Sequence, residues 1–317
     1  MTRFISIRLL YLLMGWVIAS VLIFFSLRVL PGDVAQVIAG TQATPARVAE
    51  LRAALGLNEN LFAQYFDWMR GIVTFNLGDS VVTGTSMTGE IMAKLEVTMP
   101  LTIMSLIVGA SIAFPLGIYS ALRHDKPSSR LLTSASITLS AVPVVWAGLL
   151  LIIVFSNTLH WLPSQGFPRE GWANPAAAFV ALMLPAITIG LVEGAVLLRF
   201  VRSAALTALT SDHVRTAMSR GMTRTHALVA RGMPGVGLSI ISLLGLQVAG
   251  LIVGAVLIEQ LFSLPGLGKL LIVNVGNRDL PMVQTILLVL TGIILAVGTL
   301  VDIVHRILDP RLRTETA

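Results

Sequence analysis

Six apolar segments of about 20 residues each restrict what this chain can fold into more than any other feature of its sequence. Five of the six contain no Asp, Glu, Lys or Arg, and the remaining one contains a single acid, Glu193. Because an α-helix rises about 1.5 Å per residue, each segment is long enough to cross the roughly 30 Å hydrocarbon core of a bilayer. The segments are residues 9–27, 97–122, 131–157, 175–198, 232–258 and 280–301.

The composition agrees with a membrane location, because charged residues make up only 12% of the chain, against about 25% in soluble domains. We therefore predict an all-α integral membrane protein with six transmembrane helices. The first segment follows Arg3 and Arg8, as the apolar part of a signal peptide would. Its apolar run exceeds the roughly 7–15 residues typical of a signal peptide, so we expect it to remain as the first helix.

The Lys and Arg residues between the apolar segments predict the orientation, since cytoplasmic loops carry an excess of these residues. If both termini are cytoplasmic, most of the 22 basic residues fall inside, and six of them are arginines within residues 199–231. The long segment 29–96 then lies outside, and it contains more acidic than basic residues. The net charge of +6 is therefore interpreted as a topology signal, and no nucleic-acid partner is expected.

The outside segment carries helix signals, so we expect a structured extracytoplasmic loop. Thr44 can cap a helix that starts at Pro45 and ends near Gly56. Its apolar face would hold Val48, Leu51 and Leu55. A second helix is predicted from apolar residues at helical spacing. These are Phe62, Tyr65, Phe66, Met69 and Ile72, with Trp68 beside them. We expect a small helical lid packed on the bundle, with direct substrate recognition as the alternative.

The chain is predicted to divide into three parts. Residues 1–30 form an N-terminal tail and the first helix, residues 31–96 the outside loop, and residues 97–317 a core of five helices. Residues 199–234 are the only long inside loop, between the fourth and fifth transmembrane helices. This basic loop is either a docking element for a cytosolic protein or a solvated topology signal.

A short helix is predicted within the inside loop. Asp212 can cap it, and it would run through Met218. Ala217 and Gly221 lie four residues apart and would share a shallow face that another protein can approach closely. Gly221 can also end the helix. These features suit docking.

Glu193 is the only acid deep in a predicted span, and charges inside a membrane are functional candidates because they are costly to bury in lipid. It either faces polar groups of another helix in the bundle interior or lines a translocation path. Glu259 and Asp302 lie near the ends of spans, where we expect them to reach the interface and anchor the fold.

The turn with Pro265, Gly266 and Gly268 fits a tight re-entrant hairpin. It is a candidate for an outer gate, or it only terminates the preceding helix. His213 and His226 have no accompanying carboxylate pair, so we expect no metal site, and we expect no cofactor. The chain has no Cys, which excludes disulfides, zinc fingers and cysteine nucleophiles. It has no P-loop pattern, so we predict that it does not hydrolyse ATP itself.

Residues of the inside loop resemble a known motif. Thr216-Ala217, Gly221 and Met233-Pro234 resemble the EAA loop of bacterial importer permeases, in which E-A-A, three residues and Gly precede a terminal Leu-Pro. Gly221 and Pro234 keep the spacing of that motif, while Arg215 stands where the general motif has Glu. The stretch DHVRTAMSRG is similar to D-Y-V-R-T-A-R-A-K-G of the peptide/opine/nickel family of ABC transporter permeases.

Further motifs of that family resemble this chain from end to end. The matching residues are Pro31-Gly32-Asp33, Leu55-Gly56-Leu57 with Gln64, Tyr65 and Trp68, Gly78 and Ser80, Pro143 to Gly148, Trp161-Leu162-Pro163 with Gly166, Glu259, Phe262 and Pro265 to Gly268, Arg278-Asp279 with Pro281, and Asp309-Pro310-Arg311 with Arg313. Taken in order along the chain, they identify it as similar to the B-type permease subunit of a dipeptide or oligopeptide importer.

The resemblance implies a multi-pass subunit of a bacterial inner membrane that works by alternating access on peptide substrates. It implies three kinds of partner: a second permease of similar fold, two ATP-binding cassette ATPase subunits (or one fused subunit), and an extracytoplasmic substrate-binding protein. The residues it assigns to the ATPase-coupling loop are Asp212, Arg215, Thr216, Ala217, Gly221 and Pro234. A permease for a nickel chelate, glutathione or another small solute is the alternative within the family, and a passive channel is the alternative from a different class.

Overall fold

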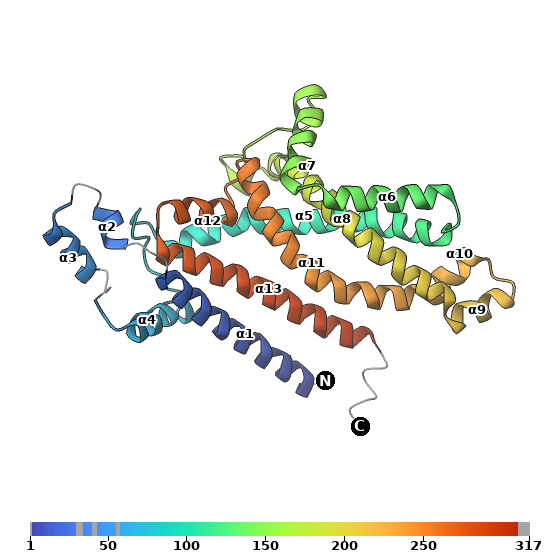
Figure 1. Ribbon diagram of the computed structural model, residues 1–317, viewed down its shortest axis with the longest axis horizontal. Helices are drawn as coiled ribbons and strands as arrows, with labels where there is room; N and C mark the ends of the chain where they lie inside the picture. The colour runs from blue at the N-terminus through green and yellow to red at the C-terminus, as the bar shows by residue number, and fades with distance from the viewer. Residues whose placement is uncertain (1, 30–33, 40–42, 55–57, 310–317) are drawn as a thin grey trace. The chain divides into compact units, whose positions relative to one another are not determined.

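The computed structural model describes residues 2–29, 34–39, 43–54 and 58–309, which form helices and connecting turns (Figure 1). The helices are α1 (Thr2–Val29), α2 (Val34–Ala39), α3 (Pro45–Ala54), α4 (Leu61–Val73), α5 (Met87–Leu122), α6 (Pro127–Ala141), α7 (Val144–Leu151), α8 (Pro175–Thr210), α9 (Asp212–Ser219), α10 (Arg224–Ala227), α11 (Met233–Leu261), α12 (Leu267–Gly276) and α13 (Leu280–Leu308). Shorter helical turns cover Ile152–Thr158, Gly171–Ala173 and Leu228–Gly232, and Asp79 pairs with Ser86 in an isolated antiparallel bridge.

These elements group into two compact units. The first consists of the described residues of Met1–Val97 and Pro265–Ala296, and the second of those of Thr98–Leu264 and Val297–Ala317. Two long helices, α5 and α13, contribute residues to both units.

Five described helical stretches are long and apolar enough to cross a membrane, and they overlap five of the six predicted segments. They are α1, α5, α8, the stretch Arg224–Gly245, which includes α10 and the first part of α11, and α13. The all-helical membrane fold expected from the sequence is therefore present in the described part of the chain.

The predicted segment 131–157 is two helices and not one. α6 and α7, the latter continued by the π-helical turn Ile152–Thr158, meet at an angle of 103°. The break falls at Val142 and Pro143, where ψ angles of 127° and 133° are extended. Proline has no N–H to continue a helix and disfavours helical backbone in the residue before it. The described chain thus has five spans, or six if this bent pair is one span.

In the first unit, α1 packs closely against α13 near the middle of that helix. A Cβ atom on Gly15 would lie 3.6 Å from Leu295 Cδ1, and one on Gly292 would lie 3.1 Å from Trp16 Nε1. Since Gly15 and Trp16 of α1 meet Leu295 and Gly292 of α13, the two helices run in opposite directions past each other.

Both helices predicted in the segment after α1 are present. α3 begins at Pro45, and Thr44 Oγ1 accepts a hydrogen bond from the Arg47 backbone N–H at 3.4 Å, as expected for a cap. α4 contains the apolar residues that predicted it. The expected end of the first helix at Gly56 lies outside the described residues, as do the family-like motifs at 31–33, 55–57 and 310–313.

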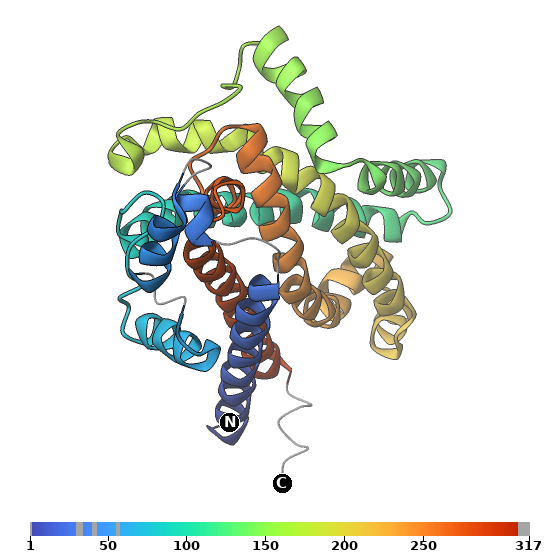
Figure 2. The ribbon, with the colours of Figure 1, turned by 60° about the vertical axis from the view of Figure 1, so that its left-hand side comes forward.

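In the second unit, α8 is the helix around which α6, α7 and α11 pack (Figure 2). Two of its glycines, Gly190 and Gly194, also meet α5 at Gly109. A Cβ atom on Gly194 would lie 2.9 Å from Gly109 Cα, and one on Gly190 would lie 2.8 Å from the Ser105 carbonyl oxygen. Helices in lipid associate through close packing of small residues, because burial of apolar side chains drives them little there. The glycines therefore hold α5 and α8 backbone to backbone.

We expect Gly194→Ala to destabilise the isolated subunit by about 1–3 kcal/mol, because the new Cβ would overlap backbone atoms that cannot rotate away. Gly237→Ala in α11 is the matched control, since a Cβ there meets no described atom within 4 Å. Alanine should stabilise that position slightly, by roughly 0.5–1 kcal/mol. Unfolding of the purified subunit in detergent measures both, and equal stability of the two variants would contradict the close packing.

Candidate functional site

The predicted inside loop is mostly helical. α8 continues as far as Thr210, and after Ser211 the chain forms α9, α10 and a π-helical turn that leads directly into α11. The prediction that Asp212 caps α9 is wrong by one residue, because Ser211 occupies the cap position with an extended backbone. The Ser211 hydroxyl donates a hydrogen bond back to the Ala208 carbonyl at 2.6 Å. Asp212 lies in the first turn of α9, where a carboxylate interacts favourably with the helix dipole.

Gly221 ends the turn after α9, as the sequence predicted. Its φ angle of +93° lies in the left-handed region that favours glycine. The Met222 N–H donates to the Ala217 carbonyl at 3.2 Å, and the Gly221 N–H donates to the Met218 carbonyl at 2.9 Å. This pair of hydrogen bonds is a Schellman motif, and it satisfies carbonyl groups that the end of a helix otherwise leaves open.

α9 has two different faces. Val214 and Ala217 are buried in a cluster of apolar side chains that also contains Leu209, Leu228 and Ile240. The expectation that Ala217 and Gly221 share an exposed face is therefore wrong, because Ala217 is only 6% exposed and packs against its own subunit. Residues three apart on a helix lie on one side, so Val214 and Ala217 turn inward together.

The other face of α9 is exposed. It carries Asp212, His213, Arg215, Thr216, Ser219 and Arg220. A hollow of about 310 Å³ borders this side of α9. It is lined by Asp212, His213, Thr216, Ala217, Arg220, Met222 and Arg231. Pro234, the second residue of α11, lines a separate hollow of about 820 Å³ between α8 and α11. The structure thus brings five of the six coupling-loop residues onto or next to α9 and places Pro234 at the start of α11.

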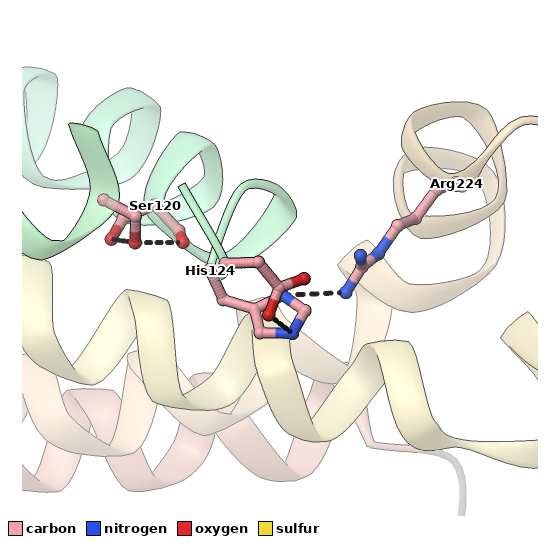
Figure 3. Close-up of polar contacts among 5 residues, drawn as sticks. Ser120, His124 and Arg224 are labelled. Atoms are coloured by element: carbon pink, nitrogen blue, oxygen red, sulfur yellow. Dashed lines mark hydrogen bonds and ion pairs between the residues drawn. The ribbon is translucent and has the colours of Figure 1, made fainter. Parts of the chain in front are cut away.

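A polar contact that sequence reasoning missed ties α10 to the turn between α5 and α6 (Figure 3). The Arg224 Nη2 atom lies 3.1 Å from His124 Nδ1, and His124 Nε2 lies 3.0 Å from Asp125 Oδ1. Because arginine can only donate, Nδ1 accepts, and the ring proton then belongs on Nε2 facing the carboxylate. At the base of the same turn, the hydroxyls of Ser120 and Ser129 lie 2.8 Å apart.

Glu193 is half-buried in α8 and faces α11. Gln247 Nε2 donates to the Glu193 backbone carbonyl at 2.8 Å and to its Oε2 at 3.1 Å. The carboxylate borders a hollow of about 460 Å³ whose other lining residues are Val144, Ile189, Ala249, Gly250, Val253, Gly254 and Leu257. Glu193 is therefore a single carboxylate in an otherwise apolar recess, with one polar partner from the neighbouring helix.

Glu259 does not reach the interface as expected. It is completely buried, and Thr98 Oγ1 donates a hydrogen bond to its Oε1 at 2.6 Å. This contact joins α11 to α5 within the second unit, so the predicted anchoring role fits while the predicted exposure is wrong.

The proposed gate residues lie in and around the first turn of α12. Gly266 is the residue before the helix, with a φ angle of −97°, and Gly268 is its second residue; both are buried. The preceding reversal is at Ser263, whose φ is +52°. The tight turn is therefore a few residues earlier than predicted.

Comparison with known proteins agrees with this architecture. Residues 1–102 match the family of N-terminal membrane components of binding-protein-dependent transport systems. Residues 113–314 match the family described as binding-protein-dependent transport system inner membrane component.

Curated relatives match over nearly the full length. A probable peptide ABC transporter permease protein of Sinorhizobium fredii is 34% identical over 294 residues, 93% of this chain and 94% of that protein. A putative peptide transport system permease protein of Brucella abortus is 33% identical over 313 residues, 99% of both chains. A glutathione transport system permease protein of Escherichia coli is 31% identical over 313 residues, again 99% of both.

A multi-pass helical membrane protein with these similarities is a transporter component and not an enzyme. The chain belongs to the family of binding-protein-dependent transport system inner membrane components. It is thus a permease subunit of an ABC transporter in the inner membrane, and a transporter of this kind depends on ATPase and binding-protein partners.

Proposed function

We propose that this chain, with a second permease subunit, forms the translocation path of an ATP-driven importer for di- or oligopeptides. The observation that carries the proposal is α9, an eight-residue helix with one face buried in its own subunit and the other exposed. It coincides with the residues that resemble the coupling loop of importer permeases. The names of the Sinorhizobium and Brucella relatives support peptides as the substrate class.

Glutathione is the second candidate substrate, because the Escherichia coli relative is named for it and matches the whole chain. Glutathione is itself a tripeptide, so the two candidates share amide and carboxylate chemistry. They differ in the γ-linkage and the thiol, which a peptide importer has no need to recognise.

Transport measurements distinguish these candidates and the passive channel. In proteoliposomes with the partner permease, ATPases and binding protein, we expect uptake of a labelled dipeptide that requires ATP. Preferential uptake of labelled glutathione would favour the second candidate. Equal flux with and without ATP would contradict an ATP-driven importer and favour a channel.

In the proposed orientation both termini and the α9–α10 segment face the cytoplasm, and the chain between α1 and α5 faces outside. The native chain has no Cys, so single cysteines report without background. Cysteines at Thr85 and Thr216, both exposed, should react with membrane-impermeant maleimide from opposite sides in intact cells and inverted vesicles. Labelling of both from the same side would contradict the orientation.

Coupling is proposed to run through the exposed face of α9, with Asp212, Arg215 and Thr216 at the ATPase surface. Ala217 would hold α9 on its own subunit, Gly221 would end the turn after α9, and Pro234 would begin the helix that follows. ATP binding would draw the ATPases together and move α9 with them. Because Arg224 of α10 contacts His124, the α5–α6 turn would share that movement. The partners shift the conformational equilibrium only if they bind its two states with different affinities.

Thr216→Trp tests this coupling more cleanly than a change at Ala217 or Gly221. Bulk at Ala217 would overpack the subunit's own core, and any side chain at Gly221 would strain its backbone. Thr216 is exposed, so its variant should insert normally yet lose ATPase binding by roughly 5- to 150-fold, from an overpacking cost of about 1–3 kcal/mol. ATPase retention on purification and ATP-driven uptake are the measurements.

Thr158→Trp is the matched control for Thr216→Trp. Thr158 is equally exposed and lies in the π-helical turn after α7, away from α9 in sequence and in packing. We expect it to retain the ATPases. If both variants retain them and transport normally, α9 is not the coupling element.

Glu193 is proposed to line the translocation path and meet the amino group of a peptide. Glu193→Gln keeps the shape and the ability to accept a hydrogen bond from Gln247, but removes the charge. We expect reduced uptake with unchanged assembly. Gln247→Leu is the control for structure, because it removes the partner and leaves the charge. Wild-type uptake by Glu193→Gln would show that the acid has a structural role only.

Pro265, Gly266 and Gly268 stay a proposed part of the outer gate, although the tight turn itself lies at Ser263. The support is the burial of both glycines at the start of α12, where the addition of any side chain would need room.

A further inference from the structure

α4 exposes an apolar stripe that its own unit leaves uncovered. At 3.6 residues per turn, Phe62, Phe66 and Val73 lie within about 40° of one another around the helix. Their exposed fractions are 63%, 66% and 68%. Asp67 is also exposed but lies about 100° or more from the stripe around the helix, with Ala63 and Arg70 between them. Three large apolar side chains in one line are more than the scattered exposure normal for a soluble surface.

The side of α4 next to the exposed stripe packs on α1. Tyr65 Oη lies 2.8 Å from Ser20 Oγ, and the Trp68 ring stacks on Phe24 with centroids 5.9 Å apart. Phe62, at the edge of the exposed stripe, contacts the ring of Phe25 with centroids 6.2 Å apart. The exposed stripe is therefore continuous with the side of α1.

These contacts fix the level of α4 along the membrane-spanning helix. Ser20 to Phe25 lie inside the charge-free run 9–27 of α1, and the first charge beyond it is Arg28. At about 1.5 Å per residue, Ser20 is roughly 10 Å inside the end of that run. α4 therefore packs against α1 below the level at which the apolar run ends.

A contact with α13 independently places α4 at the same depth in the membrane. The Trp68 Nε1–H donates a hydrogen bond to Thr285 Oγ1 at 3.2 Å. Thr285 lies inside the charge-free run 280–301. Two neighbouring spans thus place α4 beside segments that must themselves lie within the hydrocarbon region.

The side of α1 next to α4 is also left partly uncovered by the chain. Ile18 and Val21, which lie within about 40° of Phe25 around α1, are 56% and 37% exposed. α1 is a candidate span with only 11% of its most apolar window buried within the chain. The occupant of this surface in a membrane is acyl chain, and the stripe on α4 extends the same surface.

We propose that α4 is embedded in one leaflet of the bilayer, with Phe62, Phe66 and Val73 in contact with lipid. Helices with an aromatic apolar face and a polar opposite face bind in this way at membrane interfaces. Arg70, exposed and adjacent to the stripe, can extend to lipid phosphates. The leaflet is the outer one in the orientation proposed above, while the lipid contact itself does not rest on that orientation.

The consequence is that the segment after α1 is fixed to the bilayer along one edge. Only parts of it away from α4 would then be free to act as a moving lid or to meet a binding protein.

Spin labels at single cysteines test the proposal in the assembled transporter in lipid nanodiscs. Labels at Phe62, Phe66 and Val73 should collide several-fold more often with lipid-soluble oxygen than with a water-soluble nickel chelate. A label at Asp67, on the same helix, should show the reverse preference. The Phe66 and Val73 positions carry the test even if loss of Phe62 disturbs its contact with Phe25.

Two outcomes would overturn the proposal. If labels at Phe66 and Val73 collide with the nickel chelate as often as a label at Asp67 does, the stripe faces water and is open to the binding protein. If both positions are shielded from oxygen and nickel chelate alike, a protein partner covers the stripe. Neither result depends on substrate uptake, so the proposed transport function stands or falls separately.

Discussion

The backbone contact between α5 and α8 is the constraint on which the rest of the second unit depends. Gly109, Gly190 and Gly194 let the two helices approach so closely that no Cβ fits between them. That face of α8 packs against α5. Glu193, the residue before Gly194, therefore points away from this contact. It meets Gln247 of α11. The position of the intramembrane acid therefore follows from small residues beside it, and a bulkier α8 would place the carboxylate elsewhere.

The spans could be predicted from the sequence because the requirement for them is chemical and local. A run of about 20 residues without charge has few alternatives to a membrane helix. The break at Pro143 could not be predicted in the same way. Proline disfavours helix in the residue before it, yet Pro100 and Pro115 lie inside α5 and Pro185 lies inside α8. A proline alone therefore does not determine where a span of this chain breaks. The continuation of α8 to Thr210 could not be predicted. Its last residues are a mixture of polar and apolar types, and whether such a segment is helical depends on its packing.

The ends of the helices show why other parts of the structure could not be predicted from the sequence. Four helices, α4, α9, α11 and α12, end with the same pair of backbone hydrogen bonds and a residue of positive φ. Only α9 has glycine there. The others have Phe75, Ser263 and Arg278, with φ angles of 54°, 52° and 55°. A left-handed residue other than glycine costs free energy that surrounding contacts must offset, so single-sequence reasoning finds Gly221 and misses the other three. Contacts such as Arg224 with His124 join residues too far apart in sequence for any local pattern to predict.

In α9, the residues that pack on the subunit and the residues that are exposed lie on different faces of the helix. Val214 and Ala217 hold it to its own subunit, while Asp212, Thr216 and Arg220 take no part in that core. Substitutions on the exposed face of α9 can therefore accumulate without loss of folding, whereas substitutions of Val214 and Ala217 cannot. If α9 is the coupling element proposed above, exchanges on the exposed face of this one helix are enough to change the ATPase partner of a duplicated transporter. Partner choice among related transporters would then evolve independently of the membrane fold.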